Sequence, residues 1–189
     1  RGRRGVGAGG PVAVEWLGGD AVRSLPAMGG REAFERIVGS LEQATPSAPG
    51  PLDTADLERV IASVARHTRR GAVVVLFSDL LDLPIEALDQ FTSLGAQRRT
   101  LIVVQVLDPL EADFNLSGPL RLRATETRYL VETDAETARD GYLAALAKLQ
   151  ETWRARLVSR RGRLVVCNSA ENPVDVVRAI IRAAEGRPG

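Results

Sequence analysis

Three short apolar runs along the chain predict strands that are buried on both faces. Their apolar residues follow one another without regular polar alternation, which is typical of parallel strands covered by helices. Segments with apolar residues at helical spacing lie between and after them. Strand and helix therefore alternate, and the pattern predicts an α/β domain with a mostly parallel sheet. The runs are residues 72–77, 101–107 and 164–167, and the helical segments are residues 85–94, 142–157 and 174–181.

Upstream of the first run, the pattern predicts a hairpin followed by two helices. Residues 12–16 and 21–25 flank a turn whose glycines can adopt positive φ. Asp53 or Thr54 is expected to cap the second helix. The apolar face of the first helix consists of Phe34, Ile37, Val38 and Leu41, and that of the second of Leu57, Val60, Ile61 and Val64.

We expect one domain, with no internal repeat. After the second apolar run, residues 120–122 and 128–132 predict a further pair of strands. The expected parts are a flexible linker at 1–11, a sheet core with its hairpin at 12–108, a β-excursion at 109–134 and a helix–strand–helix segment at 135–189.

The composition favours an ordinary globular domain over a disulfide-stabilised, nucleic-acid-binding or membrane-spanning protein. The chain has 189 residues, of which 44% are hydrophobic, so it can build a core without a metal or disulfide. Cys167 is the only cysteine, which indicates a reducing, cytoplasmic environment. Lys and Arg number 25 against 24 Asp and Glu, so the charge footprint of a nucleic-acid binder is missing. The apolar runs are far shorter than the ~20 residues of a membrane-spanning helix.

Candidate chemistry lies directly after the predicted strands, because ligands of open α/β sheets gather at the carboxyl ends of the strands. The residues there are Ser78, Asp79, Asp108, Asn168 and Ser169. One interpretation is that the Asp79 carboxylate holds a hard cation such as Mg²⁺. The other is that it caps backbone amides of the turn that follows.

A hydroxyl for such a cation could come from Thr54, which otherwise caps its own helix. His67 lies in the last turn of a predicted helix, where the helix dipole favours a cation. A structural role is therefore expected for His67, as it is for Cys167 within its strand. The glycines of residues 5–10 have no strand before them and do not predict a phosphate loop.

With these residues in view, the chain resembles a bacterial family of von Willebrand factor A-like proteins of uncharacterised function, whose genes commonly accompany MoxR-type AAA+ ATPases. The strongest stretches are residues 70–82 and 103–111. Similar features continue through residues 114–118, Glu126-Thr127 and a helix start at residues 140–142.

This resemblance implies a von Willebrand A, or Rossmann-like, doubly wound sheet. Such sheets often carry a metal-ion-dependent adhesion site made by an Asp-x-Ser-x-Ser loop, a Thr and an Asp. By position, Thr54 and Asp79 would be the last two ligands, with Ser78 assisting through a hydrogen bond. The Asp-x-Ser-x-Ser loop occurs nowhere in the sequence. We therefore expect only a partial Mg²⁺ site here, and a complete one only in a longer protein.

The chain begins with Arg1 rather than Met, and we expect it to be a piece of a longer protein. By the resemblance it starts after the first central strand, which would lie between the strands near Val14 and Val75. Two sheet edges would then lack partners, so the resemblance implies self-association.

The function implied by the resemblance is a non-enzymatic protein-interaction module. It would work with a MoxR-type AAA+ ATPase in chaperone-like assembly or maturation of client proteins, with Ser78 and Asp108 in the partner-binding edge. The alternative is a small metal-dependent α/β hydrolase that uses the strand-end carboxylates. A third possibility is an arginine-mediated polyanion binder. Its arginines, at 1–4, 69–70, 98–99 and 160–163, would mostly lie at the opposite edge of the sheet.

Overall fold

The computed structural model describes residues 10–17, 24–43, 54–81, 83, 85–95, 98–123 and 130–186. The chain divides into two compact units. The first is formed by residues 1–67 with 125–127, and the second by residues 68–124 with 128–189. The linker prediction at 1–11 falls almost entirely outside the described residues, as do the glycines at 5–9, the turn at 18–20 and Asp53.

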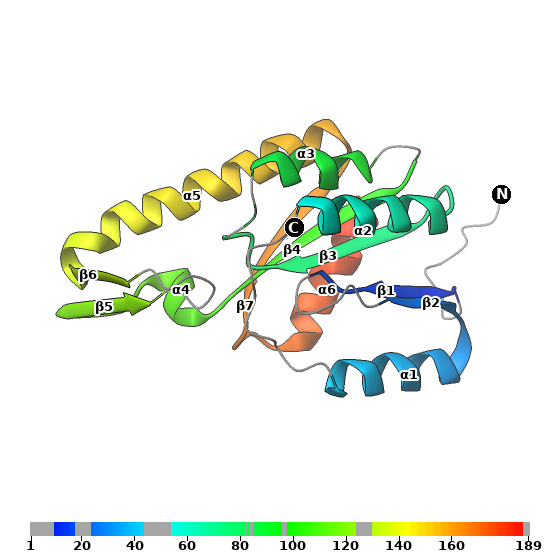
Figure 1. Cartoon of the computed structure of the whole chain (residues 1–189), viewed down its shortest axis with the longest axis horizontal. Helices are drawn as coiled ribbons and strands as arrows, with labels where there is room; N and C mark the ends of the chain where they lie inside the picture. The colour runs from blue at the N-terminus through cyan, green and yellow to red at the C-terminus, as the bar shows by residue number, and fades with distance from the viewer. Residues whose placement is uncertain are drawn as a thin grey trace. The chain divides into compact units, whose positions relative to one another are not determined.

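The centre of the second unit is a parallel sheet with the strand order β3-β4-β7 in the described part of the chain (Figure 1). The strands are β3 (Val73–Ser78), β4 (Thr100–Leu107) and β7 (Arg163–Asn168). Val73 pairs with Thr100, and Ile102 pairs with Arg163. The three apolar runs are therefore strands of one parallel sheet, as their pattern predicts.

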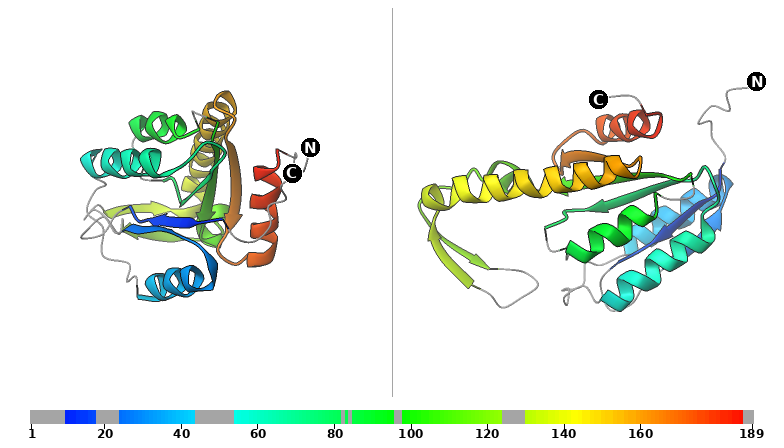
Figure 2. Two further views of the ribbon diagram at one scale, coloured as in Figure 1. Left: turned by 90° about the vertical axis from the view of Figure 1, so that its right-hand side faces the viewer. Right: turned by 90° about the horizontal axis from the view of Figure 1, so that it is seen from above.

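Helices cover both faces of this sheet, and α6 (Pro173–Ala184) lies on the opposite side from α3 (Ile85–Ser93) (Figure 2). On the α6 side, Ile102, Val104 and Cys167 form a core cluster against which Val176 and Ile180 of α6 pack. The side chain of Asn172 accepts a hydrogen bond from the Val174 amide and caps α6, and Pro173 occupies the first helical position, where its missing N–H costs no hydrogen bond.

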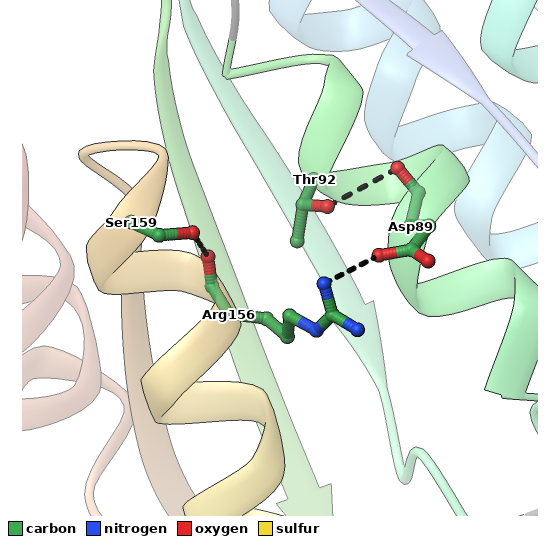
Figure 3. A network of polar contacts seen from close by, with 4 residues as sticks. All are labelled: Asp89, Thr92, Arg156 and Ser159. Carbon is green, nitrogen blue, oxygen red and sulfur yellow. Dashed lines mark hydrogen bonds and ion pairs between the residues drawn. The ribbon is translucent and has the colours of Figure 1, made fainter.

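The other face is covered by α3 and the long helix α5 (Ala135–Ser159). The rings of Phe91 and Trp153 lie 6.5 Å apart between the two helices, and both side chains are buried. Figure 3 shows a polar link between the same two helices, where Arg156 and Asp89 form an ion pair at 3.3 Å. Both partners are more than half exposed, so this pair contributes little to stability.

The β-excursion consists of a short helix, α4 (Pro109–Asp113), and the antiparallel strands β5 (Pro119–Arg123) and β6 (Leu130–Asp134). The pair of strands lies beside the N-terminal part of α5 (Figure 1). The Asp134 carboxylate caps α5 by accepting from the Thr137 amide. The resemblance placed a helix start at residues 140–142; this is wrong, because the cap at Asp134 begins the helix at Ala135.

The first unit contains an antiparallel hairpin of β1 (Val12–Glu15) and β2 (Ser24–Met28), followed by α1 (Gly30–Gln43) and α2 (Thr54–His67). The second strand of the hairpin was expected at residues 21–25 and instead begins at Ser24. Leu57 and Val60 of α2 are buried as predicted. On α1 the predicted inner face is not enclosed, because Phe34 is 68% exposed and Leu41 52% exposed.

Candidate functional site: the carboxyl edge of the parallel sheet

The strand register defines the edge at which the candidate residues lie. Ser78 ends β3 opposite Gln105, while Leu107 and Asn168 pair at the ends of β4 and β7. Asp79 thus follows the last paired residue of β3, and Asp108 follows the end of β4. All three strands run in the same direction, so these residues share one edge of the sheet.

After β3, the chain makes a tight turn that is held by its own side chains. The Ser78 hydroxyl accepts a hydrogen bond from the Leu80 amide at 3.1 Å. The Asp79 Oδ1 accepts one from the Leu81 amide at 3.2 Å. Leu80 is fully buried and has φ of 65°, an uncommon backbone conformation for a leucine. The capping interpretation of Asp79 is therefore confirmed, while the rest of its carboxylate stays at the exposed edge.

Asp108 has a comparable local role at the end of β4. Its Oδ1 accepts from the Leu110 amide at 2.8 Å, and the Glu111 carboxylate accepts from the Asp108 amide at 2.9 Å. Together they form a capping box that begins α4. The Asp-Pro-Leu-Glu sequence therefore turns the chain sharply at this edge.

Behind that turn, aromatic residues anchor the excursion. The rings of Phe114 and Tyr142 lie 4.8 Å apart, and Phe114 is buried with φ of 45°. Burial raises the pKa of the Tyr142 phenol, and the nearby Glu111 carboxylate adds to the increase. The tyrosine consequently stays neutral in the neutral pH range.

At the end of β7, Asn168 and Ser169 complete the edge. The Asn168 Oδ1 accepts from the Ala170 amide at 2.9 Å, and the Asn168 amide donates to Glu171 at 2.9 Å. The Ser169 amide donates to the Leu107 carbonyl at 2.8 Å. Each strand end therefore uses a side-chain oxygen to fix the loop that follows it.

A pair of amide side chains, the buried Gln105 and the partly buried Gln150, lies beneath the β3 turn and has no role in the sequence-based predictions. The Gln105 Nε2 donates to the Asp79 carbonyl at 2.8 Å. The Gln150 Nε2, on α5, donates to the Gln105 Oε1 at 2.9 Å. The available signal was a single polar residue within an otherwise apolar strand, since a buried amide requires partners.

The residues predicted for a partial metal site lie in different units. Thr54 is the first residue of α2 in the first unit, but its side chain lies outside the described side chains. Asp79 lies in the second unit. The described residues contain no group of three or more His, Cys, Asp or Glu side chains that could hold a metal. Since Mg²⁺ takes octahedral oxygen ligation, Asp79 by itself does not fit this ion.

His67 and Cys167 lie where their structural interpretation predicts. His67 ends α2, and its Nδ1 lies 3.3 Å from the Ser63 hydroxyl. Cys167 is buried in β7, where its thiol donates to the Gln105 carbonyl at 3.5 Å. Burial raises the pKa of this thiol, with a smaller contribution from Glu171. A raised pKa disfavours the thiolate that a nucleophilic cysteine needs.

The opposite, amino edge of the sheet carries the arginines. Arg98 and Arg99 precede β4, and Arg160 and Arg161 precede β7, as predicted. An open depression of about 600 Å³ on α5 lies toward the same edge, because α5 ends shortly before β7 begins. It is lined by Lys148, Glu151, Thr152, Ala155, Arg156 and Ser159.

Comparison with known sequences assigns the family. Residues 7–152 match the family described as "Protein of unknown function DUF58". The chain belongs to the DUF58 family. No curated protein matches the sequence of this DUF58 chain significantly.

Two solved structures resemble this DUF58 chain in fold. The conserved hypothetical protein BatB from Bacteroides thetaiotaomicron matches with a TM-score of 0.50 over 93% of this chain and 80% of its own. An aerotolerance-related membrane protein from Bacteroides fragilis NCTC 9343, with multiple mutations to serines, matches with a TM-score of 0.51 over 93% and 79%. Each is 16% identical to this chain, so the likeness concerns the fold alone. Within the described residues, no helix has the length and apolar character needed to cross a membrane.

Proposed function

We propose that this DUF58 chain is a non-enzymatic protein-interaction module with a von Willebrand A-type sheet. It works with a MoxR-type AAA+ ATPase in chaperone-like assembly or maturation of client proteins, and it binds through the carboxyl edge of β3-β4-β7. The ATPase and the client come from the family resemblance. The edge comes from the geometry of the strand ends.

The observation that carries the proposal is how the acidic side chains of this edge are held. Asp79 and Asp108 are exposed, yet each uses one carboxylate oxygen to hold the backbone that follows its strand. Their positions are therefore set before any partner arrives, which lowers the entropy lost on binding. A rigid pair of exposed carboxylates suits a basic surface on the partner.

A second feature supports an interaction module over an isolated globular unit. Val174, Val177 and Ile181 follow one another at helical spacing on α6 and are 54%, 52% and 43% exposed. Exposed apolar side chains that form a continuous stripe are typical of surfaces that bind other proteins. The same helix packs against the core cluster through Val176 and Ile180, so the core holds the exposed stripe in place.

The proposal is tested by measuring the affinity of the purified chain for a MoxR-type AAA+ ATPase from the same genome. Asp79→Ala should weaken binding by about tenfold or more, the loss expected when a charged contact is removed. Asp79→Asn keeps an acceptor for the Leu81 amide and loses the charge, so an equal loss assigns the effect to charge. Asp140→Asn, at an exposed carboxylate on α5, is the matched control and should bind normally.

Binding that survives Asp79→Ala and Asp108→Ala together would contradict the proposed edge. The alternative function, a metal-dependent hydrolase, predicts instead that Mg²⁺ or Mn²⁺ supports hydrolysis of a phosphate or carboxylic ester by the purified chain. Such activity, lost in Asp79→Asn, would replace the interaction module by the enzyme.

A further inference from the structure

The turn at residues 78–81 is held more firmly than an ordinary loop. It includes a fully buried leucine, Leu80, whose φ of 65° lies in the left-handed region. Side chains with a Cβ disfavour this region, so surrounding contacts must impose it. Two amides of the turn, those of Leu80 and Leu81, donate to side chains of the turn itself.

The Asp79 carbonyl is fixed from below. It lies one residue beyond the last β3–β4 pair, where the ladder no longer holds the chain. There it accepts a hydrogen bond of 2.8 Å from Gln105, whose side chain is completely buried. Two hydrogen bonds therefore hold Asp79: its carboxylate accepts from the Leu81 amide, and its backbone carbonyl accepts from the Gln105 side chain.

Only one orientation of the Gln105 amide satisfies both of its contacts. A carbonyl can only accept, so the Gln105 nitrogen must face Asp79. Its oxygen then faces α5 and accepts from the Gln150 Nε2 at 2.9 Å. Arg154, one turn further along α5, lies 3.5 Å from the Gln150 Oε1. The pair therefore connects the β3 turn to the surface of α5.

An amide side chain is uncommon at a position as deeply buried as that of Gln105 on β4. Val103, Val104 and Leu107 on the same strand are at most 2% exposed. An apolar side chain at position 105 could fill the space without the desolvation that a fully buried amide requires. What the amide provides, and an apolar side chain could not, is the hydrogen bond to Asp79.

We infer that Gln105 is a positioning residue for the partner-binding edge. Its amide nitrogen, which faces the Asp79 carbonyl while its oxygen accepts from Gln150, sets the Asp79 peptide so that the carboxylate faces outward in the conformation that binds. This inference rests on the proposed function, because Asp79 is the contact that Gln105 prepares.

The experiment uses the full chain with Gln105→Leu, Gln150→Leu, both together, and Thr92→Val. The last is the control, since Thr92 is another buried polar residue, whose hydroxyl donates to the Asp89 carbonyl on α3. Three quantities are measured in each variant: the urea midpoint, the hydrogen exchange of the Leu80 and Leu81 amides relative to the β4 amides, and the affinity for the MoxR-type ATPase.

Gln105→Leu should speed exchange at Leu80 and Leu81 by about tenfold over the β4 amides and weaken ATPase binding by a similar factor. Gln150→Leu leaves the Gln105–Asp79 bond in place, so it should lower the urea midpoint with binding and local exchange within about twofold. The double variant should be more stable than Gln105→Leu, because no side-chain amide of the pair is left without its partner. The Asp79 carbonyl still lacks its donor there, so binding and protection should not recover. Thr92→Val should change the midpoint alone.

The outcomes separate the inference from the function on which it rests. Unchanged exchange at Leu80 and Leu81 in the folded double variant would overturn the positioning role. So would normal ATPase binding by that variant when Asp79→Ala abolishes binding. If Asp79→Ala itself binds normally, the proposed function is wrong, and the inference is overturned with it whatever the exchange rates show.

Discussion

Strands β3 and β4 have similar sequences and very different surroundings. Residues 73–77 read Val-Val-Val-Leu-Phe, and residues 101–104 read Leu-Ile-Val-Val. All four of the latter are completely buried, because β4 has a strand on each side and helices over both faces. On β3, Val73 is 48% exposed and Phe77 60% exposed, since in the described residues this strand has β4 on one side alone.

The exposure of Val73 and Phe77 corrects the prediction that the whole first apolar run is buried. A buried position was expected along the whole of residues 72–77, and only part of that run is enclosed. Unbroken apolar runs identify strands of a parallel sheet, but they do not distinguish a central strand from an edge strand. The difference lies in the number of neighbours, which no local pattern contains.

The largest expected effect comes from shortening one large apolar side chain to alanine on each strand, which tests the difference in burial between β3 and β4. Ile102→Ala should lower the free energy of unfolding by about 2–5 kcal/mol, because it leaves a cavity in an enclosed core. Phe77→Ala should lower it by at most about 1 kcal/mol, because much of the ring is already in water. Urea unfolding followed by circular dichroism measures both. Equal losses would show that β3 is as enclosed as β4.

A second test asks how tightly the turn between α5 and β7 packs against the start of β4. A Cβ at Gly162 would lie 2.8 Å from Leu157 Cδ2 and 3.2 Å from the Leu101 carbonyl oxygen. Gly162→Ala should therefore destabilise the chain by about 1–3 kcal/mol. Gly141→Ala is the matched control. Gly141 lies inside α5, and a Cβ there would meet nothing within 4 Å apart from the helix's own neighbouring backbone, so the change should stabilise by about 0.5–1 kcal/mol. Thermal unfolding measures the stability change of both variants. An unchanged stability in Gly162→Ala would mean that the turn before β7 can shift to make room for a Cβ.

A third test concerns the side of β3 that has no partner strand within the part of the chain that the structure describes. Edge strands with exposed apolar residues promote association between copies, and a charge blunts them. We expect the wild-type chain to self-associate as its concentration rises and Phe77→Lys to shift the distribution toward monomer. Sedimentation velocity measures this. A monodisperse, cooperatively melting wild-type monomer would contradict the expected association.

The smallest expected effect is a pH dependence of stability that arises from the buried Cys167 thiol on β7. Because burial raises the pKa of Cys167, the folded chain holds the thiol proton more strongly than the unfolded chain does. The stability that depends on the neutral thiol is complete below its ordinary pKa of 9.0 and decreases as pH rises above it. Urea midpoints between pH 8 and 10 should fall more steeply in wild type than in Cys167→Ala. Parallel slopes would mean that the thiol is not enclosed.

The candidate site was only partly predictable, for physical reasons that differ between residues. Asp79 and Asp108 were found because they follow apolar runs, and the capping role considered for Asp79 is confirmed. Gln105 was not found, because its role depends on Gln150, which is 45 residues away in the chain. The Mg²⁺ site, the ATPase and the absence of catalysis stay predictions.

The sequence by itself determined the elements: its apolar spacing located the strands and helices of the parallel sheet, and its Asn172-Pro173 pair marked the start of α6. These are local properties, since they depend on hydrogen bonds and side chains a few residues apart. The tertiary structure alone decided that β4 is central and that β3 is an edge strand among the described residues, and that Gln105 holds Asp79. Both depend on which distant segments become neighbours, and burial and the cost of an unpaired amide are defined only after that packing is complete.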